Sequence, residues 1–576
     1  MLDAPFVLLD DARPGGAARL YRRPVEVIAA ATVAEVRPAL DRVRVGIARG
    51  LHAAGMLAYE AAPAFEPSLP ATDSAHPLAW FGLFERWEAV EPRTVLPDPA
   101  GAHVLPPEPL IDRAEYDRRI AAVLALIAAG DVYQANLTFQ ATVRFAGDPL
   151  ALYAAVRDRA GAGWGGIVAT GEALHLSFSP ELFFALDGDT LTCRPMKGTA
   201  RRGATPADDA AAARALSEDA KNRAENLMIV DLLRNDLARV ATPGSVAVPE
   251  LFHVERYPTV LQMTSTVTAT LAPGLDAIDV LAAAYPCGSI TGAPKLRAIE
   301  ALADIEGVPR AAYTGSIGRI DGTGAQFNVA IRTLTVRDGA ATMGLGGGIV
   351  ADSTADAEWD EALAKGAFLT AGQRTVDLIE TMRFDPIDGF PLLDRHLARM
   401  KASADALGFR FDRHAARNEL QAATFRLREG KRIRLLLARS GAVAIEVAPL
   451  PVTPERMSIA VVPLPVDPHD FRLAHKTSDR AFYDTARRNA GTAEVVFARA
   501  DGRLTEGSFT NIFIERDGLL VTPPLARGLL PGVLRAELIV TGRAAEGDLT
   551  RADLTQGFFV GNALRGLVPA FVAVAH

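Results

Sequence analysis

The segment Asn222-Arg-Ala-Glu-Asn-Leu-Met-Ile-Val-Asp-Leu-Leu-Arg-Asn-Asp236 decides the fold of the first part of this chain. It lies within residues 207–240, whose Ala, Leu and charged residues predict one long helix. Six more segments with charged, amide or glycine residues occur before and after it. They are Gly130-Asp-Val-Tyr-Gln-Ala-Asn-Leu-Thr138, Ser179-Pro-Glu-Leu-Phe183, Arg194-Pro-Met-Lys-Gly-Thr-Ala200, Gly288-Ser-Ile-Thr-Gly-Ala-Pro-Lys295, Gly344-Leu-Gly-Gly-Gly-Ile-Val350 and Ala357-Glu-Trp-Asp-Glu361.

Length and composition set the broad class of the protein. The 576 residues exceed what one hydrophobic core supports, so two or more domains are expected. The charged share of 23% is ordinary for soluble globular proteins, and the net charge of −8 argues against a nucleic-acid binder. The first residues lack the basic and apolar regions of a signal peptide, and no apolar run is long enough to span a bilayer. We therefore expect no membrane association.

The chain has only two cysteines, Cys193 in Thr-Cys-Arg-Pro and Cys287 in Pro-Cys-Gly-Ser. Two cysteines exclude a disulfide framework and favour a reducing, cytoplasmic location. Neither lies on the glycine-rich elbow that the cysteine nucleophile of a glutamine-hydrolysing domain needs. Both are therefore predicted to be buried, small apolar residues.

Apolar periodicity predicts several elements of the first part. Apolar residues recur at helical spacing between Asp112, a predicted N-cap, and Gly130, a predicted helix end. Residues 326–336 alternate like a strand, and residues 354–371 predict another helix.

A new strand-like run, residues 375–383, follows that helix after the turn Ala-Gly-Gln-Arg. We place a domain boundary near Gln373, between a domain of residues 1–372 and a domain of residues 373–576. No internal repeat marks either part.

The predicted helix 354–371 carries a pair of carboxylates. Glu358 and Glu361 are three residues apart and share one helix face, where a hard cation such as Mg²⁺ can bind them together. Lys365 lies one turn further along the same face. Taken alone, a solvated acidic face with an ion pair explains this pattern better. The glycine run at 344–348 lacks the Gly-Lys-Ser/Thr of a phosphate-binding loop, and its glycines more simply let the backbone approach a ligand.

Together and in this order, the seven segments closely resemble the chorismate-utilising enzymes, the family of anthranilate, isochorismate and aminodeoxychorismate synthases. The resemblance is strong over residues 110–370 and looser before them. It implies an α+β fold with a β-sandwich flanked by helices. Anthranilate synthases carry alanine where Lys197 stands, and isochorismate and salicylate synthases carry a lysine base where Gln134 stands. The pair present here resembles the aminodeoxychorismate branch.

The roles of the family's residues carry over onto the matching positions. A desolvated lysine amine can act as a nucleophile, and the resemblance implies that Lys197 attacks the chorismate ring as its hydroxyl leaves, before ammonia displaces it. Glu181 resembles the general acid that helps the hydroxyl depart, a task that needs a raised pKa. The other implied residues are the Mg²⁺ ligands Glu225, Glu358 and Glu361, the substrate contacts Gln134, Thr199 and Lys365, and the enolpyruvyl-carboxylate contacts Tyr313 and Arg332.

Two positions depart from the family pattern. Gln262 stands where anthranilate synthases place a histidine, so the resemblance does not support a proton step that depends on histidine there. Asn222 stands where many relatives carry a carboxylate one turn before Glu225. The metal shell is therefore expected to be one ligand leaner.

The second part of the chain contains a different set of polar segments. They are Leu378-Ile-Glu-Thr-Met-Arg383, Leu393-Asp-Arg-His-Leu-Ala-Arg-Met-Lys-Ala-Ser403, Ala474-His-Lys-Thr-Ser-Asp-Arg-Ala-Phe-Tyr483, Leu504-Thr-Glu-Gly-Ser-Phe-Thr-Asn-Ile-Phe513 and Leu530-Pro-Gly-Val-Leu-Arg535. A pyridoxal phosphate enzyme needs a lysine, an anion that faces the pyridinium nitrogen, and a phosphate cradle. Lys476, at the end of a predicted strand, and Glu506 are candidates for the first two.

The predicted phosphate cradle is the helix start at Pro531-Gly-Val-Leu-Arg, where Val533 and Leu534 present free N–H groups. Arg399 is predicted to complete it. Each of these residues alone has an ordinary explanation as a solvated side chain, a loop or a turn.

Jointly, the segments resemble fold-type IV pyridoxal phosphate enzymes, which include branched-chain and D-amino-acid aminotransferases and aminodeoxychorismate lyase. The resemblance spans residues 375–570 and implies a two-subdomain α/β fold. It is weaker at Gly561-Asn-Ala-Leu-Arg565, where many relatives have a Ser or Thr that contacts phosphate. Either Asn562 substitutes for that contact or the contact is lost. Members of this group are commonly dimeric, so a homodimer through this part is compatible with the resemblance.

The two resemblances predict a bifunctional route to 4-aminobenzoate, in which chorismate is aminated and pyruvate is then eliminated. The assignment of the second part as a lyase rests on its fusion to the first, which is an argument by association. One alternative is an anthranilate synthase-type enzyme fused to a branched-chain or D-amino-acid-type aminotransferase. Another is an inactive regulatory or assembly protein, which the intact set of predicted catalytic residues argues against. Because no glutaminase is present, a separate glutamine amidotransferase subunit is expected to supply ammonia.

Overall fold

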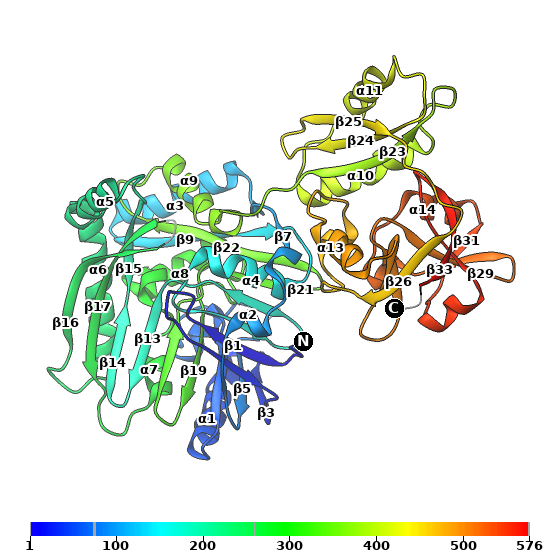
Figure 1. Ribbon diagram of the computed structural model, residues 1–576. Helices are drawn as coiled ribbons and strands as arrows, with labels where there is room; N and C mark the ends of the chain where they lie inside the picture. Colours follow the sequence, from blue (N-terminus) through cyan, green and yellow to red (C-terminus); the bar gives the residue numbers. More distant parts are fainter. Residues whose placement is uncertain (1, 73–76, 258–259, 574–576) are drawn as a thin grey trace. The chain divides into compact units, whose positions relative to one another are not determined.

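The computed structural model describes residues 2–72, 77–257 and 260–573, which form two compact units of mixed helices and strands (Figure 1). Unit 1 comprises Met1–Leu96, Pro106–Arg144 and Tyr153–Gly372. Unit 2 comprises Pro97–Leu105, Phe145–Leu152 and Gln373–His576. In the described part of the chain, none of the helices combines the length and apolarity needed to cross a membrane.

Unit 1 is built on two antiparallel sheets, each of ten strands in the described part of the chain. The first sheet has, in order of neighbouring strands, β18 (Gly292–Ala293), β9 (Gln134–Val143), β22 (Ala340–Ile349), β21 (Thr333–Arg337), β12 (Leu174–Ser177), β11 (Gly165–Ala169), β1 (Phe6–Asp10), β2 (Ala18–Arg22) and β6 (Glu88–Val90), with β8 (Glu108–Pro109) beside β9.

The second sheet has, in the same kind of order, β15 (Met196–Arg201), β17 (Val260–Thr270), β14 (Thr190–Arg194), β13 (Leu182–Asp187), β20 (Gly324–Asn328), β19 (Ser316–Asp321), β4 (His52–Leu57), β5 (Ala79–Phe84) and β3 (Glu26–Ala30), with β16 (Ala247–Arg256) beside β17. Strands far apart in the sequence are therefore neighbours in both sheets. Residues from distant motifs meet where these strands end.

Two large apolar cores lie in the described part of unit 1. One lies between the sheets, since it combines Val7 and Val168 of the first sheet with Met56 and Trp80 of the second. The other packs the second sheet against a layer of helices that contains α1 (Val33–Ala48), α6 (Ala220–Ala238) and α7 (Ala277–Ala284). Removing these apolar surfaces from water supplies the main stabilising free energy.

The helix predicted after Asp112 is confirmed as α3 (Arg113–Ala129). The Asp112 carboxylate accepts a hydrogen bond of 2.8 Å from the N–H of Glu115, and Gly130 ends the helix in the left-handed conformation. The single helix predicted over residues 207–240 is wrong, because two helices occupy this region. Asp219 leaves the helical conformation there and caps the second helix by accepting the N–H of Asn222 at 2.7 Å. The two helices are α5 (Pro206–Glu218) and α6.

The strand predicted over residues 326–336 is also divided. β20 ends at Asn328 and β21 begins at Thr333, and between them the N–H of Val329 donates to the carbonyl of Glu181 at 3.1 Å. Arg332 has a left-handed φ of 51°, so the chain turns out of the strand at a predicted site residue.

The helix predicted over residues 354–371 is shorter than expected. It forms α9 (Ala355–Ala364), which the short 3-10 helix η4 (Ala367–Leu369) follows.

Unit 2 contains a three-stranded and an eight-stranded sheet in the described part of the chain. In the first, β23 (Leu378–Phe384), β24 (Lys431–Leu437) and β25 (Val443–Pro449) are antiparallel, and α10 (Leu393–Leu407) and α11 (Arg413–Thr424) share their apolar core. The second has the order β28 (Leu504–Gly507), β27 (Glu494–Ala498), β26 (Met457–Pro463), β33 (Gly566–Val572), β32 (Phe558–Asn562), β29 (Asn511–Arg516), β30 (Leu519–Thr522) and β31 (Ala544–Glu546). A further pairing of β28 with β29 closes part of this sheet on itself.

Two short segments that precede Gln373 in the sequence are parts of unit 2. They pair as β7 (His103–Val104) and β10 (Phe145–Ala146). The side chain of Gln373 bonds both the N–H and the carbonyl of Val104, at 3.0 and 3.1 Å. The ring of His103 lies 5.7 Å from that of Phe471. These contacts make the segments structural elements of unit 2.

Candidate active sites

The predicted residues of unit 1 meet at the glycine run of β22. A Cβ on Gly348 would lie 2.2 Å from Nε2 of Gln134 and 2.9 Å from Nζ of Lys197. A Cβ on Gly347 would lie 3.3 Å from both Oε2 of Glu358 and Nζ of Lys365. Any side chain at Gly348 would therefore collide with the Gln134 amide and the Lys197 amine. The glycines let the backbone approach the site closely, as the sequence predicts.

Glu181 and Lys197 are electrostatic neighbours in this site. Glu181, only 3% exposed, follows β12 and precedes β13, and Lys197 lies on β15. Burial raises the pKa of Glu181 to about 7, against a hydrogen bond with Ser289 and the charge of Lys197. Burial, and then the charge of Lys365, lower the pKa of Lys197, which Glu225 and Glu181 oppose. This environment shifts Glu181 toward its protonated form and Lys197 toward its uncharged form.

Three further carboxylates line the same region from α6 and α9. Burial raises the pKa of Glu225, while nearby Lys197 and Lys221 lower it. Oε1 of Glu358 accepts a hydrogen bond of 2.6 Å from Ser353, and Oε1 of Glu361 pairs with Nζ of Lys365 at 2.9 Å.

These carboxylates do not form a compact metal cage by themselves. Among the described residues, only Asp148, Asp467 and His469 bring three possible ligand atoms within 4.8 Å of one another. Glu225, Glu358 and Glu361 are more widely spaced, although they face the same region.

Tyr313 lies beside the glycine run of β22, whereas Arg332 lies beside Phe368. The ring of Tyr313 lies where a side chain on Gly344 would stand, and burial raises the pKa of its hydroxyl. The guanidinium of Arg332 lies 5.7 Å from the ring of Phe368, and burial lowers its pKa. It forms no hydrogen bond or ion pair with a described residue. No contact in the described part of the chain joins Arg332 to Lys197.

The two departures from the family pattern have their own partners. Oγ1 of Thr199 donates to Oε1 of Gln262 at 2.9 Å, so the glutamine holds a predicted substrate contact in place. Asn222 binds Asp219 within the cap of α6, and a side chain on Gly198 would collide with it. Asn222 therefore packs closely against β15 beside Lys197.

In unit 2, Lys476 is half-buried just after the short helix α12 (Phe471–Ala474). The strand predicted to end at Lys476 is absent. The carbonyl of Lys476 accepts the N–H of Ile379 at 2.9 Å, and Thr477 forms a single β-bridge with Leu378, but no continuous strand pairing follows. Burial and then the charge of Arg399 lower the pKa of Lys476 to about 7, against the charge of Glu380. The hydroxyl of Thr477, the next residue, is buried without a partner in the described structure.

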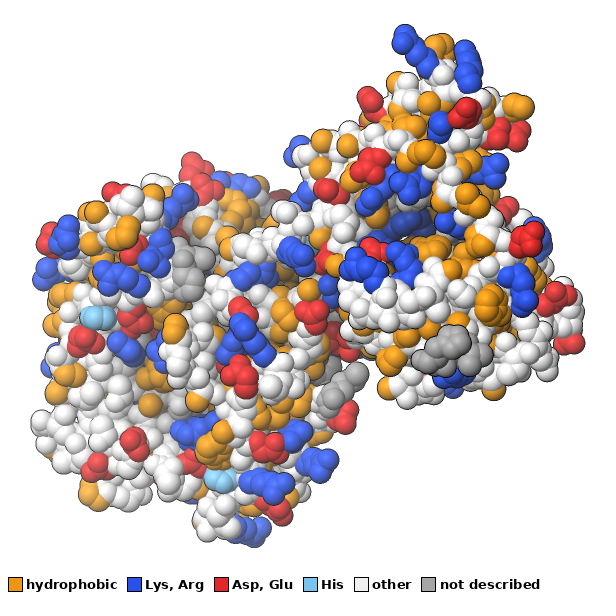
Figure 2. Space-filling view, in the orientation of Figure 1, with side chains coloured by type: hydrophobic (Ala, Val, Ile, Leu, Met, Phe, Trp, Pro, Cys, Tyr) orange, Lys and Arg blue, Asp and Glu red, His pale blue; other side chains and the backbone are white. Residues whose placement is uncertain are grey.

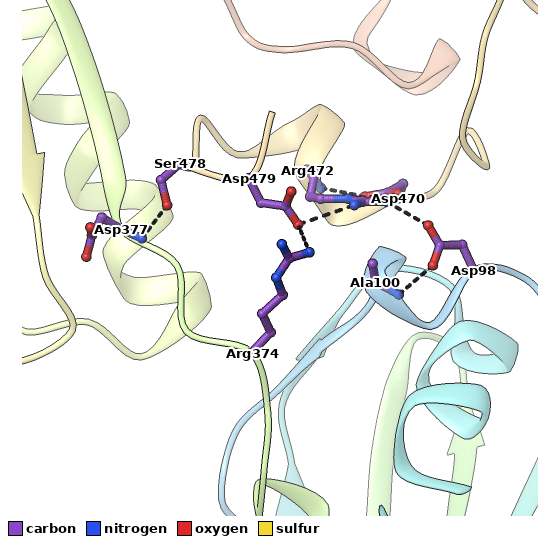
Figure 3. A network of polar contacts seen from close by, with 8 residues as sticks. All are labelled: Asp98, Ala100, Arg374, Asp377, Asp470, Arg472, Ser478 and Asp479. Atoms are coloured by element: carbon purple, nitrogen blue, oxygen red, sulfur yellow. Dashed lines mark hydrogen bonds and ion pairs between the residues drawn. The ribbon is translucent and has the colours of Figure 1, made fainter. Parts of the chain in front are cut away.

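A salt-bridge network holds the loop that carries Lys476 (Figure 3). Arg472, before the lysine, binds Asp470 at 2.6 Å, Asp98 at 3.2 Å and Asp479 at 3.3 Å. Arg374 binds the same Asp479 at 3.1 Å. Because Arg472 binds Asp470 before Lys476 and Asp479 after it, these ion pairs connect the chain on both sides of the lysine.

Arg399 connects three parts of this site. It donates to both oxygens of Glu380, at 2.8 and 2.6 Å, and to the carbonyl of Pro531 at 3.2 Å. His396 bonds the same carboxylate at 2.7 Å. Burial raises the pKa of Glu380, but Arg399 and His396 outweigh this and hold it well below its usual range.

The predicted helix start is confirmed as the N-terminus of α14 (Val533–Val540). A side chain on Gly532, its N-cap, would collide with Oδ1 of Asn511. Only glycine fits there, and the N–H groups of Val533 and Leu534 at the helix N-terminus have no acceptor within the helix. The side chain of Asn562 is already engaged, since it bonds the carbonyl of Phe509 and the N–H groups of its own turn.

Glu506 is buried on β28 and is connected to this helix start. Burial raises its pKa to about 7, which the hydrogen bond of 2.5 Å from the Tyr483 hydroxyl, the charge of Arg480 and a backbone bond from Leu530 oppose. Arg480 is also an electrostatic neighbour of Lys476. The structure therefore brings Lys476, Arg399, Glu506 and the start of α14 into one part of unit 2.

Residues 5–371 match the family described as chorismate binding enzyme, which is more than half of the chain. The chain belongs to this family. Residues 377–571, in the part that follows the chorismate binding enzyme match, match the family described as amino-transferase class IV.

Curated relatives match the chorismate binding part. Aminodeoxychorismate synthase component 1 of Klebsiella aerogenes is 44% identical over 256 residues, which are 44% of this chain and 57% of that protein. Anthranilate synthase component 1 of Streptomyces coelicolor is 40% identical over 267 residues, 46% of this chain and 52% of that protein. The chain thus spans about half the length of these relatives. The structure of anthranilate synthase component I from Streptococcus pneumoniae shares the fold, with a TM-score of 0.54 at 24% identity over 64% of this chain and 93% of that one.

Sequence reasoning missed several residues of both sites. Ser289, Tyr483, Glu380 and His396 all lie in segments that the sequence analysis singled out, but they received no role. The sequence could have pointed to these residues because each is a polar residue at a position where the surrounding pattern predicts burial, and buried polar groups need partners. Arg434 lay outside those segments, and only the fold brings it near Lys476.

Proposed function

We propose that the chain makes 4-aminobenzoate in two steps, amination of chorismate in unit 1 and elimination of pyruvate in unit 2. The observation that carries this proposal is the pair Glu181 and Lys197. Burial raises the pKa of Glu181 to about 7 and lowers the pKa of Lys197, which are the directions that general acid and nucleophilic catalysis require. By the resemblance described above, anthranilate synthases carry alanine at the position of Lys197.

In the first step, the Lys197 amine forms a bond to the substrate ring while the C–O bond of the ring hydroxyl breaks. Glu181 donates its proton to the departing oxygen, so that water leaves. Ammonia then takes the place of the lysine, which returns to its free amine. Gln134, Thr199 and Lys365 are positioned to orient the ring and its carboxylate, and Tyr313 and Arg332 to hold the enolpyruvyl carboxylate. Arg332 suits an anion, because its guanidinium has no partner among the described residues.

The wide spacing of Glu225, Glu358 and Glu361 suits a Mg²⁺ ion shared with substrate. Mg²⁺ binds through one or two carboxylates and completes its shell with water and substrate oxygens. These three residues would hold the ion, which would neutralise the ring carboxylate. Lys365, already paired with Glu361, would contact the same carboxylate.

In unit 2, the donor set fits pyridoxal phosphate. The buried hydroxyl of Thr477 and buried N–H groups of Arg434 and Arg480 have no partner in the described structure, which suits an anionic group beside Lys476. Lys476 would bind the cofactor, Glu506 would face its pyridine nitrogen, and Val533, Leu534 and Arg399 would hold its phosphate. When bound, the cofactor supplies an electron sink.

Lys476 is then the base of the second step. With a pKa near 7, its amine can take the proton from the ring carbon that bears the amino group and return it to the departing enolpyruvate. The products are 4-aminobenzoate and pyruvate. We assign the two sheets of unit 1 to a β-sandwich, and the three-stranded and eight-stranded sheets of unit 2 to two subdomains. We further propose a separate glutamine amidotransferase subunit as the source of ammonia, and a homodimer through unit 2.

The experiment that tests the first step replaces Lys197 by alanine. Chorismate, ammonium and Mg²⁺ are supplied, and the aminated product is separated chromatographically. We expect Lys197→Ala to lower the rate at least about a hundredfold, while the control Lys401→Ala, an exposed lysine of unit 2, keeps it. Full activity of Lys197→Ala, or anthranilate as the product of the unchanged chain, would contradict the proposal.

A further inference from the structure

Two arginines of unit 2 that the proposed function does not use, Arg487 and Arg565, lie against Phe509, and a third, Arg432, is an electrostatic neighbour of Arg565. The guanidinium carbons of Arg487 and Arg565 lie 5.1 and 5.5 Å from the centre of its ring, within cation–π range. They come from separate elements, Arg487 from α13 (Ala481–Ala490) and Arg565 from the turn between β32 and β33. Figure 2 shows Lys and Arg side chains gathered around a hollow in unit 2.

The turn that carries Arg565 is fixed to the chain at Phe509. Oδ1 of Asn562 accepts the N–H groups of Leu564 and Arg565 at 3.0 and 2.9 Å, and its Nδ2 donates to the carbonyl of Phe509 at 3.1 Å. Nevertheless, Nε of Arg565 is buried and has no hydrogen-bond partner in the described structure. Leaving a buried charged donor unpaired is costly, so the orphan N–H points to an acceptor on a ligand.

Arg432 faces the same space from β24. It precedes Ile433, which is buried in the core of the small sheet, so the Arg432 side chain leaves the opposite face. Its guanidinium forms no hydrogen bond or ion pair with any described residue. Burial lowers the pKa of Arg565, and the charge of Glu494 opposes this. The charges of Arg432 and Arg487 also lower the pKa of Arg565, because nearby like charges disfavour its charged form.

The acidic groups nearby do not neutralise the three arginines. Asp484 accepts one hydrogen bond from Arg487 at 3.0 Å. The buried carboxylate of Glu494 already accepts the N–H groups of Ser508 and Phe509, at 2.9 and 3.1 Å, and the Ser508 hydroxyl at 2.5 Å. An excess of positive charge therefore remains around Phe509.

This group of arginines differs from the one beside the lysine. The main electrostatic neighbours of Lys476 are Arg399, Glu380, Arg480 and Arg434. Those of Arg565 are Glu494, Arg432 and Arg487. The two groups meet at Ser508, whose carbonyl accepts a hydrogen bond from Arg480 at 3.2 Å and whose hydroxyl accepts one from Arg487 at 3.3 Å. Arg432, Arg487 and Arg565 are nevertheless not among the main electrostatic neighbours of the reactive amine.

We propose that Arg432, Arg487 and Arg565 form an anion subsite that takes a carboxylate of the substrate remote from its reacting amine. This inference rests on the proposed function of unit 2. In 4-amino-4-deoxychorismate and in 4-aminobenzoate, an amine and a carboxylate stand at opposite ends of a six-membered ring. In the substrates of α-amino-acid aminotransferases, both groups share one carbon. A carboxylate subsite outside the immediate surroundings of the lysine therefore selects the ring substrate.

The test measures the binding of 4-aminobenzoate to the full chain loaded with pyridoxal phosphate, by calorimetry. The probe is compared with aniline, which lacks the carboxylate, in the unchanged chain and in Arg565→Gln and Arg487→Gln. The control Arg527→Gln removes an exposed arginine of the same unit that pairs with Asp548. Cofactor affinity and the melting temperature are measured for every variant.

We expect the unchanged chain and Arg527→Gln to bind 4-aminobenzoate and to bind aniline much more weakly. Each subsite variant should bind 4-aminobenzoate about ten- to a hundredfold more weakly, with cofactor affinity preserved, and Arg565→Lys should recover part of the loss. Equal binding in all variants would overturn the subsite and leave the proposed function intact. A fall in cofactor affinity instead would assign the arginines to the cofactor phosphate and overturn the inference. Failure of the unchanged, loaded chain to bind 4-aminobenzoate would overturn both.

Discussion

Replacing Glu181 by glutamine should separate the stability of unit 1 from its activity. Glutamine keeps the shape of the side chain but cannot ionise. Glu181 is 3% exposed, and burial raises its pKa from 4.5 to about 7. Ionising it in the folded protein is therefore less favourable than in the unfolded chain by about 3 kcal/mol.

The sign of the effect follows from the raised pKa. The stability contributed by the protonated carboxyl is fully present below pH 4.5 and is lost as the pH rises through 7. Glu181→Gln does not lose it. The free energy of unfolding of Glu181→Gln should therefore gain about 3 kcal/mol on that of the unchanged chain between pH 4 and pH 8.

The assay follows tryptophan fluorescence in urea at several pH values. All four tryptophans, Trp80, Trp87, Trp164 and Trp359, lie in unit 1, so the signal reports that unit alone. In parallel, chorismate amination should fall about 10²- to 10⁴-fold, and the decline of activity above pH 7 should disappear. A stability difference that does not change with pH would refute the buried acid. Retained activity with an unchanged alkaline decline would refute its role as proton donor.

Four further substitutions test other parts of the structure. Lys476→Ala should abolish the cofactor absorbance that borohydride fixes to the chain, whereas retention of that label would place the cofactor on another lysine. Arg310 is 3% exposed and pairs with the buried Glu306 at 2.7 Å, so its loss leaves that carboxylate buried without its partner. Arg310→Met should therefore lower the free energy of unfolding of unit 1 by about 3–5 kcal/mol in the fluorescence assay. A change below about 1 kcal/mol would show that the ion pair is not needed for stability. In the network of Figure 3, the side chain of Arg472 is 6% exposed and that of Asp98 is 56% exposed. Arg472→Met should therefore lower the melting temperature of unit 2 and weaken cofactor binding, whereas Asp98→Ala should lower the free energy of unfolding by less than about 1 kcal/mol. Equal effects of the two substitutions would contradict this ranking.

Local signals in the sequence predicted local structure well. Asp112 and Gly130 mark the ends of α3, since a cap and a left-handed glycine act within a few residues of their own position. The start of α14 followed from Pro531-Gly532 for the same reason. The single helix over 207–240 failed at Asp219, which is compatible with a helix interior but caps α6 better.

The sites depended on contacts that no local pattern contains. The sequence singled out Glu181 and Lys197, but the burial that moves their pKa values in opposite directions comes from strands paired across the whole of unit 1. The strand predicted before Lys476 failed because salt bridges to Asp98 and Asp479 hold that loop instead of a ladder. Asp98 lies far from Lys476 in the sequence, so periodicity carries no signal of their proximity.

The measurement that tests the central claim most directly supplies the full chain with chorismate, ammonium, Mg²⁺ and pyridoxal phosphate. The products are separated and identified by mass and absorbance. The account predicts 4-aminobenzoate and pyruvate in equal amounts, and accumulation of the aminated intermediate when Lys476 is replaced by alanine. Formation of anthranilate, or of the aminated intermediate alone by the unchanged chain, would contradict it.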